Sequence, residues 1–180
     1  MEGLGYWLGG ASGRYERLTE QAVMAFQKVE GLPRTGRFDG LTRAVFENAT
    51  RPAPRSTAGD LVEVDKARQV LFLVRDGLVQ WVFNTSTGTE GPYVYEGRTY
   101  LADTPEGMFR VSSAFDGLQD TPLGVLFRPR YFHPDGIAVH GSPSVPSYPA
   151  SHGCVRVTDP AINWIWANDA MPFGSTVWVY

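Results

Sequence analysis

The stretch Ser151-His152-Gly153-Cys154-Val155-Arg156 contains the only cysteine of the 180-residue chain. A second His-Gly pair, His140-Gly141, begins fourteen residues before that cysteine. The thiolate is the attacking form of cysteine, so a cysteine nucleophile needs an imidazole that takes its proton. Because both components occur within one short stretch, the sequence indicates an acyl-transfer site with Cys154 as its nucleophile.

Two other interpretations of these residues are open. A free cysteine is often a small buried hydrophobe, but the neighbours of Cys154 are mostly polar or glycine, unlike those in a core strand. Alternatively, His140, His152 and Cys154 provide three possible zinc ligands. The chain has no second cysteine and no H-E-x-x-H, and the motif has no Asp or Glu. We therefore expect neither a metal nor a cofactor.

These residues resemble the active-site signature of the L,D-transpeptidase catalytic domain, the YkuD family, which cross-links bacterial peptidoglycan. Three further segments resemble family patterns in the expected order. Asn84–Gly88 resembles the V-S-T-G strand end, Thr104–Phe109 resembles T-P-x-G-x-F, and Phe173–Val179 resembles the final G-T-x-V-x-I strand. The resemblance implies a mainly β catalytic domain, a YkuD-like β-sandwich with a short helix.

The residues suggest a mechanism. Cys154 attacks a peptide carbonyl, forms a thioester, expels an amine and passes the acyl group to a second amine. We expect His140 to be the general base, because it ends a predicted strand that is able to aim it. Its orienting partner is expected to be a backbone carbonyl near Gly141 or Ser142, which the family resemblance favours over a carboxylate. The N–H groups of Gly153 and Cys154 are the expected oxyanion donors.

The remaining site residues have two interpretations each. His152 either supports the reaction as a donor or makes a structural hydrogen bond within the turn. Arg156, two residues after the thiol, is expected to bind a substrate carboxylate with its planar guanidinium. Ser151 is either a substrate-binding residue or a residue that shapes the turn. Tyr131 is expected to line the cleft and contact substrate, or else to be a packing residue.

The resemblance also implies the substrate. The donor is a peptidoglycan tetrapeptide stem that is cut after its third residue with release of D-Ala, and the acceptor is the side-chain amine of another stem. Two alternatives are kept. An L,D-carboxypeptidase would use the same site with water as the acceptor, whereas a non-catalytic cell-wall-binding module would use both halves of the chain as ligand platforms.

The amino-terminal part contains an internal repeat. Gly13–Thr19 (G-R-Y-E-R-L-T) recurs 23 residues later as Gly36–Thr42 (G-R-F-D-G-L-T). Each copy is typical of a turn that leads into a helix. We expect a helix over residues 20–30, capped by Thr19 and ended by Gly31, and a second helix to Asn48, capped by Asp39 or Thr42.

This segment resembles the helical peptidoglycan-binding domain. The matching residues are Thr19, Ala22, Val23, Phe26, Gln27, Gly31-Leu32-Pro33, Gly36 and Thr42. In that family a first helix precedes the position of Leu4-Gly5-Tyr6, so we expect that helix to be missing from this chain. The alternative is a helical packing or spacer unit that binds no glycan.

The stretch Arg51–Gly59 has the proline and small polar residues of a linker. We therefore predict a peptidoglycan-binding-like helical segment at 1–50, a linker at 51–59 and the catalytic domain at 60–180. Strands are expected at 61–64, 70–74, 79–83, 107–112, 137–140 and 176–180. Asp76-Gly77 predicts a hairpin turn, and Asp159-Pro160 predicts the start of a helix that extends to about Ala167.

Charge and hydropathy exclude several functions. The net charge of −3 and the scattered basic residues give no surface suited to nucleic acid. No apolar run is long enough for a membrane span, and Met1–Gly10 lacks the pattern of a signal peptide. Because an enzyme of the cell wall must be exported, we expect a location in the cell wall or periplasm, with the export signal or anchor absent from this chain.

Overall fold

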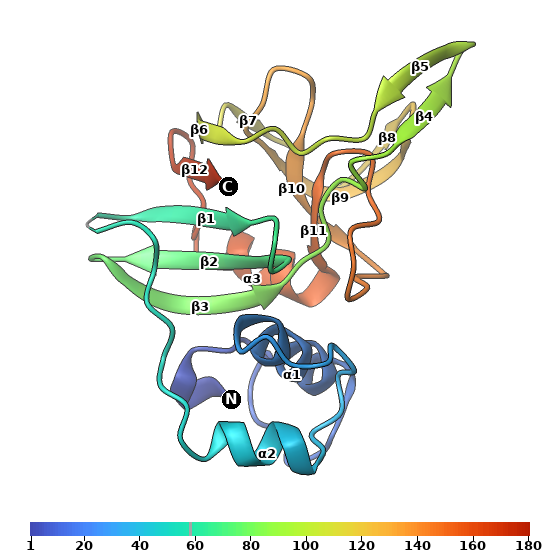
Figure 1. Ribbon diagram of the computed structural model, residues 1–180. Helices are drawn as coiled ribbons and strands as arrows, with labels where there is room; N and C mark the ends of the chain where they lie inside the picture. The colour runs from blue at the N-terminus through green and yellow to red at the C-terminus, as the bar shows by residue number, and fades with distance from the viewer. Residues whose placement is uncertain (58) are drawn as a thin grey trace.

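Two β-sheets form most of the computed structural model, which describes residues 1–57 and 59–180 (Figure 1). The first sheet consists of β1 (Leu61–Asp65), β2 (Val70–Arg75), β3 (Leu78–Asn84), β6 (Gly107–Arg110) and β12 (Thr176–Val179), in the order β3-β2-β1-β12-β6. The second consists of β7 (Ser113–Ala114), β8 (Leu118–Thr121), β9 (Gly124–Tyr131), β10 (Ala138–Ser142) and β11 (Val155–Thr158). The expected mainly β catalytic part is confirmed.

The helices are few among the described residues. They are α1 (Arg17–Val29), α2 (Gly40–Phe46), α3 (Asp159–Ala167) and a 3₁₀ turn, η1 (Glu2–Leu4). A separate hairpin of β4 (Pro92–Tyr95) and β5 (Arg98–Leu101) projects from the body at the upper right of Figure 1. No helix formed by the described part of the chain has the length and apolar character that a membrane crossing requires.

The first sheet is covered on both faces. Val62, Leu71 and Leu73 lie in a core with the second sheet and α3, whereas Phe72 and Val74 lie in a core with α1. In Figure 1 the amino-terminal helices lie together under β3. Burial on both faces explains why β2 is an unbroken apolar run rather than an alternating one.

The amino-terminal segment extends the first sheet as well as covering it. The backbone N–H of Trp7 donates to the Val82 carbonyl at 3.0 Å, and the Val82 N–H donates to the Gly5 carbonyl at 2.7 Å. The side chain of Tyr6 is fully buried in the core shared with α1. The helical segment and the sandwich are therefore one packed unit on this side of the molecule. The predicted linker includes Ala58, which lies outside the described residues.

The repeat has the same geometry in both copies. Gly13 and Gly36 have φ values of 75° and 69°, a backbone conformation that favours glycine, and a helix begins four residues after each of them. The expected Asp39 cap is confirmed, because its carboxylate accepts from the Thr42 N–H at 2.9 Å. The expected Thr19 cap is wrong: α1 begins at Arg17 after Glu16, which makes no side-chain capping bond.

The sequence signals around α3 and the β2–β3 turn are confirmed. Asp76 and Gly77 both have positive φ, at 51° and 71°, as a two-residue hairpin turn of this kind requires. The helix α3 spans the predicted residues, with Pro160 in its first turn. Its cap is Thr158, the last residue of β11, whose Oγ1 accepts from the Ala161 N–H at 3.2 Å. The cap thus joins α3 directly to the strand that follows Cys154.

Replacing Thr158 with alanine is expected to lower the free energy of unfolding by about 1 kcal/mol, because the Ala161 N–H loses its partner. The measurement is urea denaturation. Thr158→Ser keeps the hydroxyl and should retain most of the stability. Thr19→Ala should change little, since Thr19 makes only an exposed 3.4 Å contact to the Arg14 carbonyl. Equal losses at Thr158 and Thr19 would contradict the assigned cap.

Candidate active site

Three neighbouring strands of the second sheet bring the predicted residues together. In the parallel pair β10–β11, His140 lies opposite Arg156, and in the antiparallel pair β9–β10, Ala138 lies opposite Tyr131. Opposed residues, and alternate residues along one strand, point to the same side of a sheet. Tyr131, His140 and Arg156 therefore share one face, and Cys154 lies immediately before β11 at the same place.

The cysteine lies at the border between this face and the core. Its side chain is half-buried, packs against the sandwich core, and places Sγ 3.9 Å from the Gly136 carbonyl oxygen. Burial raises the pKa of the Cys154 thiol, while the Ala138 N–H and the charge of Arg156 oppose the rise. The thiol form is therefore the resting form, and the group needs a nearby base to become a thiolate.

The imidazole of His140 is buried and held in one orientation. Its Nδ1 lies 2.7 Å from the carbonyl oxygen of Gly141, which is the kind of orienting partner expected from the sequence. Because a carbonyl only accepts, Nδ1 carries the proton and Nε2 keeps its lone pair in the neutral ring. Burial lowers the pKa of His140 to about 4; the Gly141 carbonyl opposes this shift and Arg156 adds to it.

The turn before Cys154 is closed by its own serine. The Oγ of Ser151 donates to the Cys154 carbonyl at 2.6 Å and accepts from the Gly153 N–H at 3.0 Å. This pair of bonds changes the expectation for Gly153 and favours one of the two alternatives for Ser151. The Gly153 N–H is engaged rather than free for an oxyanion, and the hydroxyl of the buried Ser151 shapes the turn rather than facing substrate.

Glycine is required at position 153. Its φ is +144°, and a Cβ there would lie 2.6 Å from the backbone oxygen of Asp103. On the other side, Thr104 Oγ1 donates to the Gly153 carbonyl at 2.7 Å and accepts from the Gly88 N–H at 2.9 Å. Thr104, in the segment that resembles T-P-x-G-x-F, therefore connects the turn by hydrogen bonds to Gly88, in the segment that resembles V-S-T-G.

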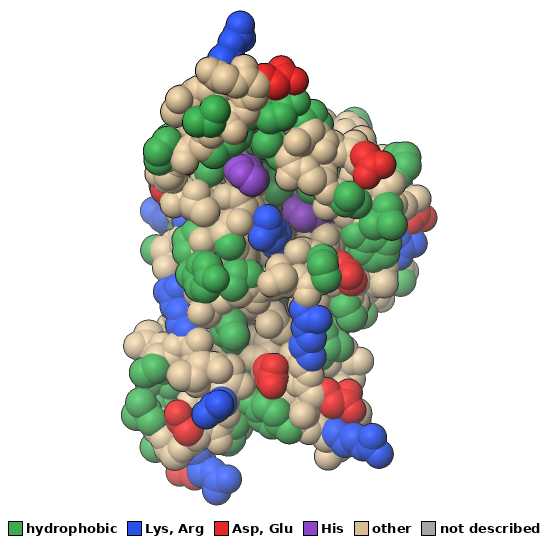
Figure 2. Space-filling model, turned by 90° about the vertical axis from the view of Figure 1, so that its right-hand side faces the viewer, with side chains coloured by type: hydrophobic (Ala, Val, Ile, Leu, Met, Phe, Trp, Pro, Cys, Tyr) green, Lys and Arg blue, Asp and Glu red, His purple; other side chains and the backbone are tan. Residues whose placement is uncertain are grey.

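The other predicted residues lie around this turn. His152 is exposed, and its ring meets that of Tyr93 edge-on at 4.7 Å between centroids. The hydroxyl of Tyr131 donates to Gln119 Oε1 at 3.0 Å, and burial, with a contribution from Cys154, raises the pKa of Tyr131. Figure 2 shows two histidines on one face of the upper half of the molecule, with a basic side chain between them.

Some residues at the site could not be found from the sequence. Thr104 belongs to a recognised motif, but its bond to Gly153 connects residues 49 positions apart. Tyr93 belongs to the β4–β5 hairpin, for which we predicted no strand. No signal in the sequence connects that hairpin to His152. Within residues 1–57 and 59–180, no group of three or more His, Cys, Asp or Glu side chains is arranged to hold a metal ion.

Replacing Gly153 with alanine is expected to lower the free energy of unfolding by roughly 1–3 kcal/mol, because the new Cβ meets the Asp103 oxygen at an unfavourable φ. Thermal unfolding measures the loss, and the alkylation rate of Cys154 reports the displacement of the turn. The matched control is Gly174→Ala, where φ is also positive, at 83°, but no atom lies within 4 Å of the added Cβ. The same loss in both variants would contradict a steric requirement at Gly153.

Comparison with known families and structures agrees with this architecture. The family model of the L,D-transpeptidase catalytic domain, YkuD, matches residues 59–179, and a peptidoglycan binding domain model matches residues 2–46. The chain therefore belongs to the L,D-transpeptidase catalytic domain family, and the residues before that domain match the peptidoglycan binding domain model. No curated protein gives a significant match.

Several solved structures of L,D-transpeptidases are similar to this chain. The L,D-transpeptidase of Xylanimonas cellulosilytica is 47% identical, with a TM-score of 0.93 over 98% of this chain and 87% of that one. An L,D-transpeptidase of Stackebrandtia nassauensis is 23% identical, with a TM-score of 0.58 over 95% of this chain and 82% of that one. One from Mycobacterium smegmatis is 20% identical, with a TM-score of 0.54 over 68% and 59%. The latter two show the shared fold.

Proposed function

We propose that this protein is a cysteine-dependent L,D-transpeptidase that cross-links peptidoglycan stem peptides through a thioester acyl-enzyme and releases D-Ala. The observation that carries the proposal is the position of Cys154 beside the strand that holds His140, whose Nδ1 is engaged by the Gly141 carbonyl. This arrangement leaves Nε2 as the free basic atom. Family membership supplies the substrate class.

The first half of the reaction forms the acyl-enzyme. Nε2 of His140 takes the thiol proton as Sγ of Cys154 attacks the carbonyl of the third stem residue. The tetrahedral intermediate then collapses, and the bond to the D-Ala nitrogen breaks. The imidazolium returns its proton to that nitrogen, so D-Ala leaves as a neutral amine and the histidine is again neutral.

The second half transfers the acyl group. The side-chain amine of an acceptor stem attacks the thioester, His140 takes a proton from that nitrogen, and the thiolate leaves and is reprotonated. Of the two expected oxyanion donors, the Cys154 N–H is the one we retain, because the Gly153 N–H already donates to Ser151. Arg156, on the face of His140, is assigned to a substrate carboxylate, and Tyr131 to the wall of the cleft.

Product analysis tests this function. Purified disaccharide-tetrapeptide is incubated with the enzyme, and with enzyme whose thiol has been blocked by iodoacetamide, and the products are identified by mass spectrometry. Dimers that appear together with D-Ala only when the thiol is free would support transpeptidation. Disaccharide-tripeptide monomers alone would replace the proposal with an L,D-carboxypeptidase. Unchanged substrate with folded, unblocked enzyme would favour a non-catalytic wall-binding module.

The amino-terminal segment and the cellular location belong to the same proposal. The division into a helical segment at 1–50, a linker at 51–59 and a catalytic domain at 60–180 follows the change in sequence pattern, and the family matches at residues 2–46 and 59–179 support it. Peptidoglycan as the ligand of both parts supports a place in the cell wall or periplasm. Sedimentation with purified sacculi would test glycan binding by the segment.

A further inference from the structure

The loop between the two halves of the site motif is held by the helical segment. Residues 143–150 connect β10, which carries His140, to the turn that carries Cys154, and they include Pro143, Pro146 and Pro149. Backbone carbonyls of this loop accept hydrogen bonds from side chains on and after α1. Arg17 donates to Pro143, Gln21 Nε2 to Val145 at 3.3 Å, and Arg34 to Ser147 at 3.2 Å.

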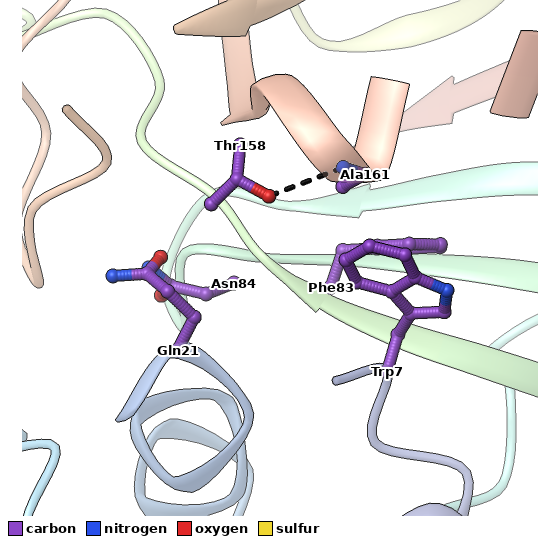
Figure 3. Close-up of a pocket in the computed structure, with 6 residues that line it drawn as sticks. All are labelled: Trp7, Gln21, Phe83, Asn84, Thr158 and Ala161. Carbon is purple, nitrogen blue, oxygen red and sulfur yellow. Dashed lines mark hydrogen bonds between the residues drawn. The ribbon is translucent and has the colours of Figure 1, made fainter. Parts of the chain in front are cut away.

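Gln21 is tied to the catalytic half at both ends of its amide. Asn84 Nδ2 donates to Gln21 Oε1 at 2.6 Å and to the same Val145 carbonyl at 3.1 Å. Figure 3 shows the Gln21 and Asn84 side chains meeting between α1 and the end of β3. The cavity that they line with Trp7, Phe83, Thr158 and Ala161 has a volume of about 10 Å³, room for one water at most. The contact is closely packed.

A buried lysine on the same helix fixes Asn84. Lys28 Nζ donates to Asn84 Oδ1 at 2.5 Å and to the carbonyls of Gln69 and Thr85 at 2.9 Å each. Lys28 is 1% exposed. Breaking one of these hydrogen bonds would leave a buried polar group unpaired, which costs folding free energy. The three bonds therefore stabilise one arrangement of Lys28 and Asn84. Contacts with α1 therefore fix the position of the chain at Asn84 and Thr85, from which the next residues continue.

The same strand end holds the far end of the loop. Ser86 Oγ donates to the Tyr148 carbonyl at 2.8 Å, and the Thr87 carbonyl accepts from the N–H groups of Ala150 and Ser151 at 3.0 Å each. Cys154 follows three residues later. Hydrogen bonds at both ends of residues 84–87, together with the backbone between them, thus connect α1 to the turn that positions the thiol.

We propose that the helical segment is a positioning element of the active site, in which Gln21 and Arg34 hold the loop 143–150 and thereby set the place of Cys154 relative to His140. This role is distinct from glycan binding and rests on the proposed function only for its effect on turnover. A small misplacement of reacting groups costs up to about a hundredfold in rate. Loss of one loop contact is therefore expected to slow the chemistry rather than weaken substrate binding.

The decisive variant is Gln21→Glu in the full chain. It keeps the oxygen that accepts from Asn84 but removes the donor to Val145 and places a carboxylate beside that carbonyl. We expect kcat to fall on the order of tenfold with KM nearly unchanged, and the alkylation rate of Cys154 to change as well. Sedimentation with sacculi should stay close to wild type, whereas the thermal midpoint should fall modestly because the amide donor is lost. The matched control is Gln80→Glu on the exposed side of β3.

A second pair of variants covers the case in which Gln21→Glu fails to fold. Arg34→Gln should lower kcat severalfold in the same direction, because Ser147 loses its donor, and Arg34→Lys should restore part of it. If folded Gln21→Glu and Arg34→Gln keep the wild-type kcat and the wild-type alkylation rate of Cys154, the proposal is overturned. It is also overturned if kcat falls only in proportion to a loss of sacculus binding. Alkylation needs no peptidoglycan, so it tests the positioning role even if the wild type proves inactive as a transpeptidase.

Discussion

Replacing Cys154 with alanine is expected to abolish D-Ala release and dimer formation, a loss on the order of 10⁴- to 10⁶-fold. The reason is that the acyl group has no other place to reside: the thioester needs Sγ, and Cys154 is the only cysteine of the chain. The measurement combines product analysis with the intact mass of the enzyme. Wild type exposed to tetrapeptide donor should gain the mass of the acyl group, and the alanine variant should gain nothing.

The stability of the variant separates chemistry from folding. Cys154 is only half-buried, so removal of its sulfur should move the thermal midpoint little. Cys154→Ser is the matched control, because the hydroxyl nearly preserves the shape but is a far weaker nucleophile at the same position. Dimer formation above about one hundredth of the wild-type rate in a folded alanine variant would contradict a cysteine nucleophile.

Local signals in the sequence were sufficient for several elements. Asp76-Gly77 between two apolar runs defined the β2–β3 hairpin, and Asp159-Pro160 defined the start of α3. Such features depend on residues a few positions apart, so the sequence alone is sufficient to predict them. The order of motifs similarly revealed the family.

The buried strand β11 was not predicted; nor were β4, β5, β7, β8 and β9, whose composition explains the failure. Exposed and half-buried residues dominate them, so they lack the apolar alternation that marks a strand with one buried face. At the site, the sequence left Ser151 with two alternatives and gave Gly153 a free N–H. Their mutual hydrogen bond depends on the shape of the turn, which residue types do not show. Backbone geometry, not residue type, decides which N–H is free.

The amino-terminal segment shows a second limit of the sequence. Its repeat predicted two helices, but nothing in it indicated that residues 5–7 pair with the edge of β3 or that Phe26 enters the core of the first sheet. Lys28 has the appearance of a solvent-facing residue of an amphipathic helix. It is instead buried against three oxygens of the catalytic half, because the partner surface supplies acceptors that helical periodicity cannot reveal.

Replacing His140 with asparagine is expected to lower kcat/KM by about 10²- to 10⁴-fold, the usual range for loss of a general base. Asparagine is the sharpest choice, because its amide N–H₂ is able to replace Nδ1 as the donor to the Gly141 carbonyl while no basic atom remains at the position of Nε2. The alkylation rate of Cys154 at neutral pH should fall too. The control is His133→Asn, which changes a histidine outside the Ser151–Arg156 motif, beside Asp135, and should retain most of the activity.

The pH dependence distinguishes a base from a structural residue. Burial lowers the pKa of His140 to about 4, so the imidazole is neutral and competent above that value and becomes protonated as the pH falls through it. Wild-type kcat/KM should therefore persist well below the ordinary histidine value of about 6.5 and decline only near pH 4. Because the variant has no imidazole at this position, its residual activity should lack that decline. If His140→Asn lowered the rate but kept the same acid limb, the titrating group would lie elsewhere, and His140 would act only by shaping the strand beside Cys154.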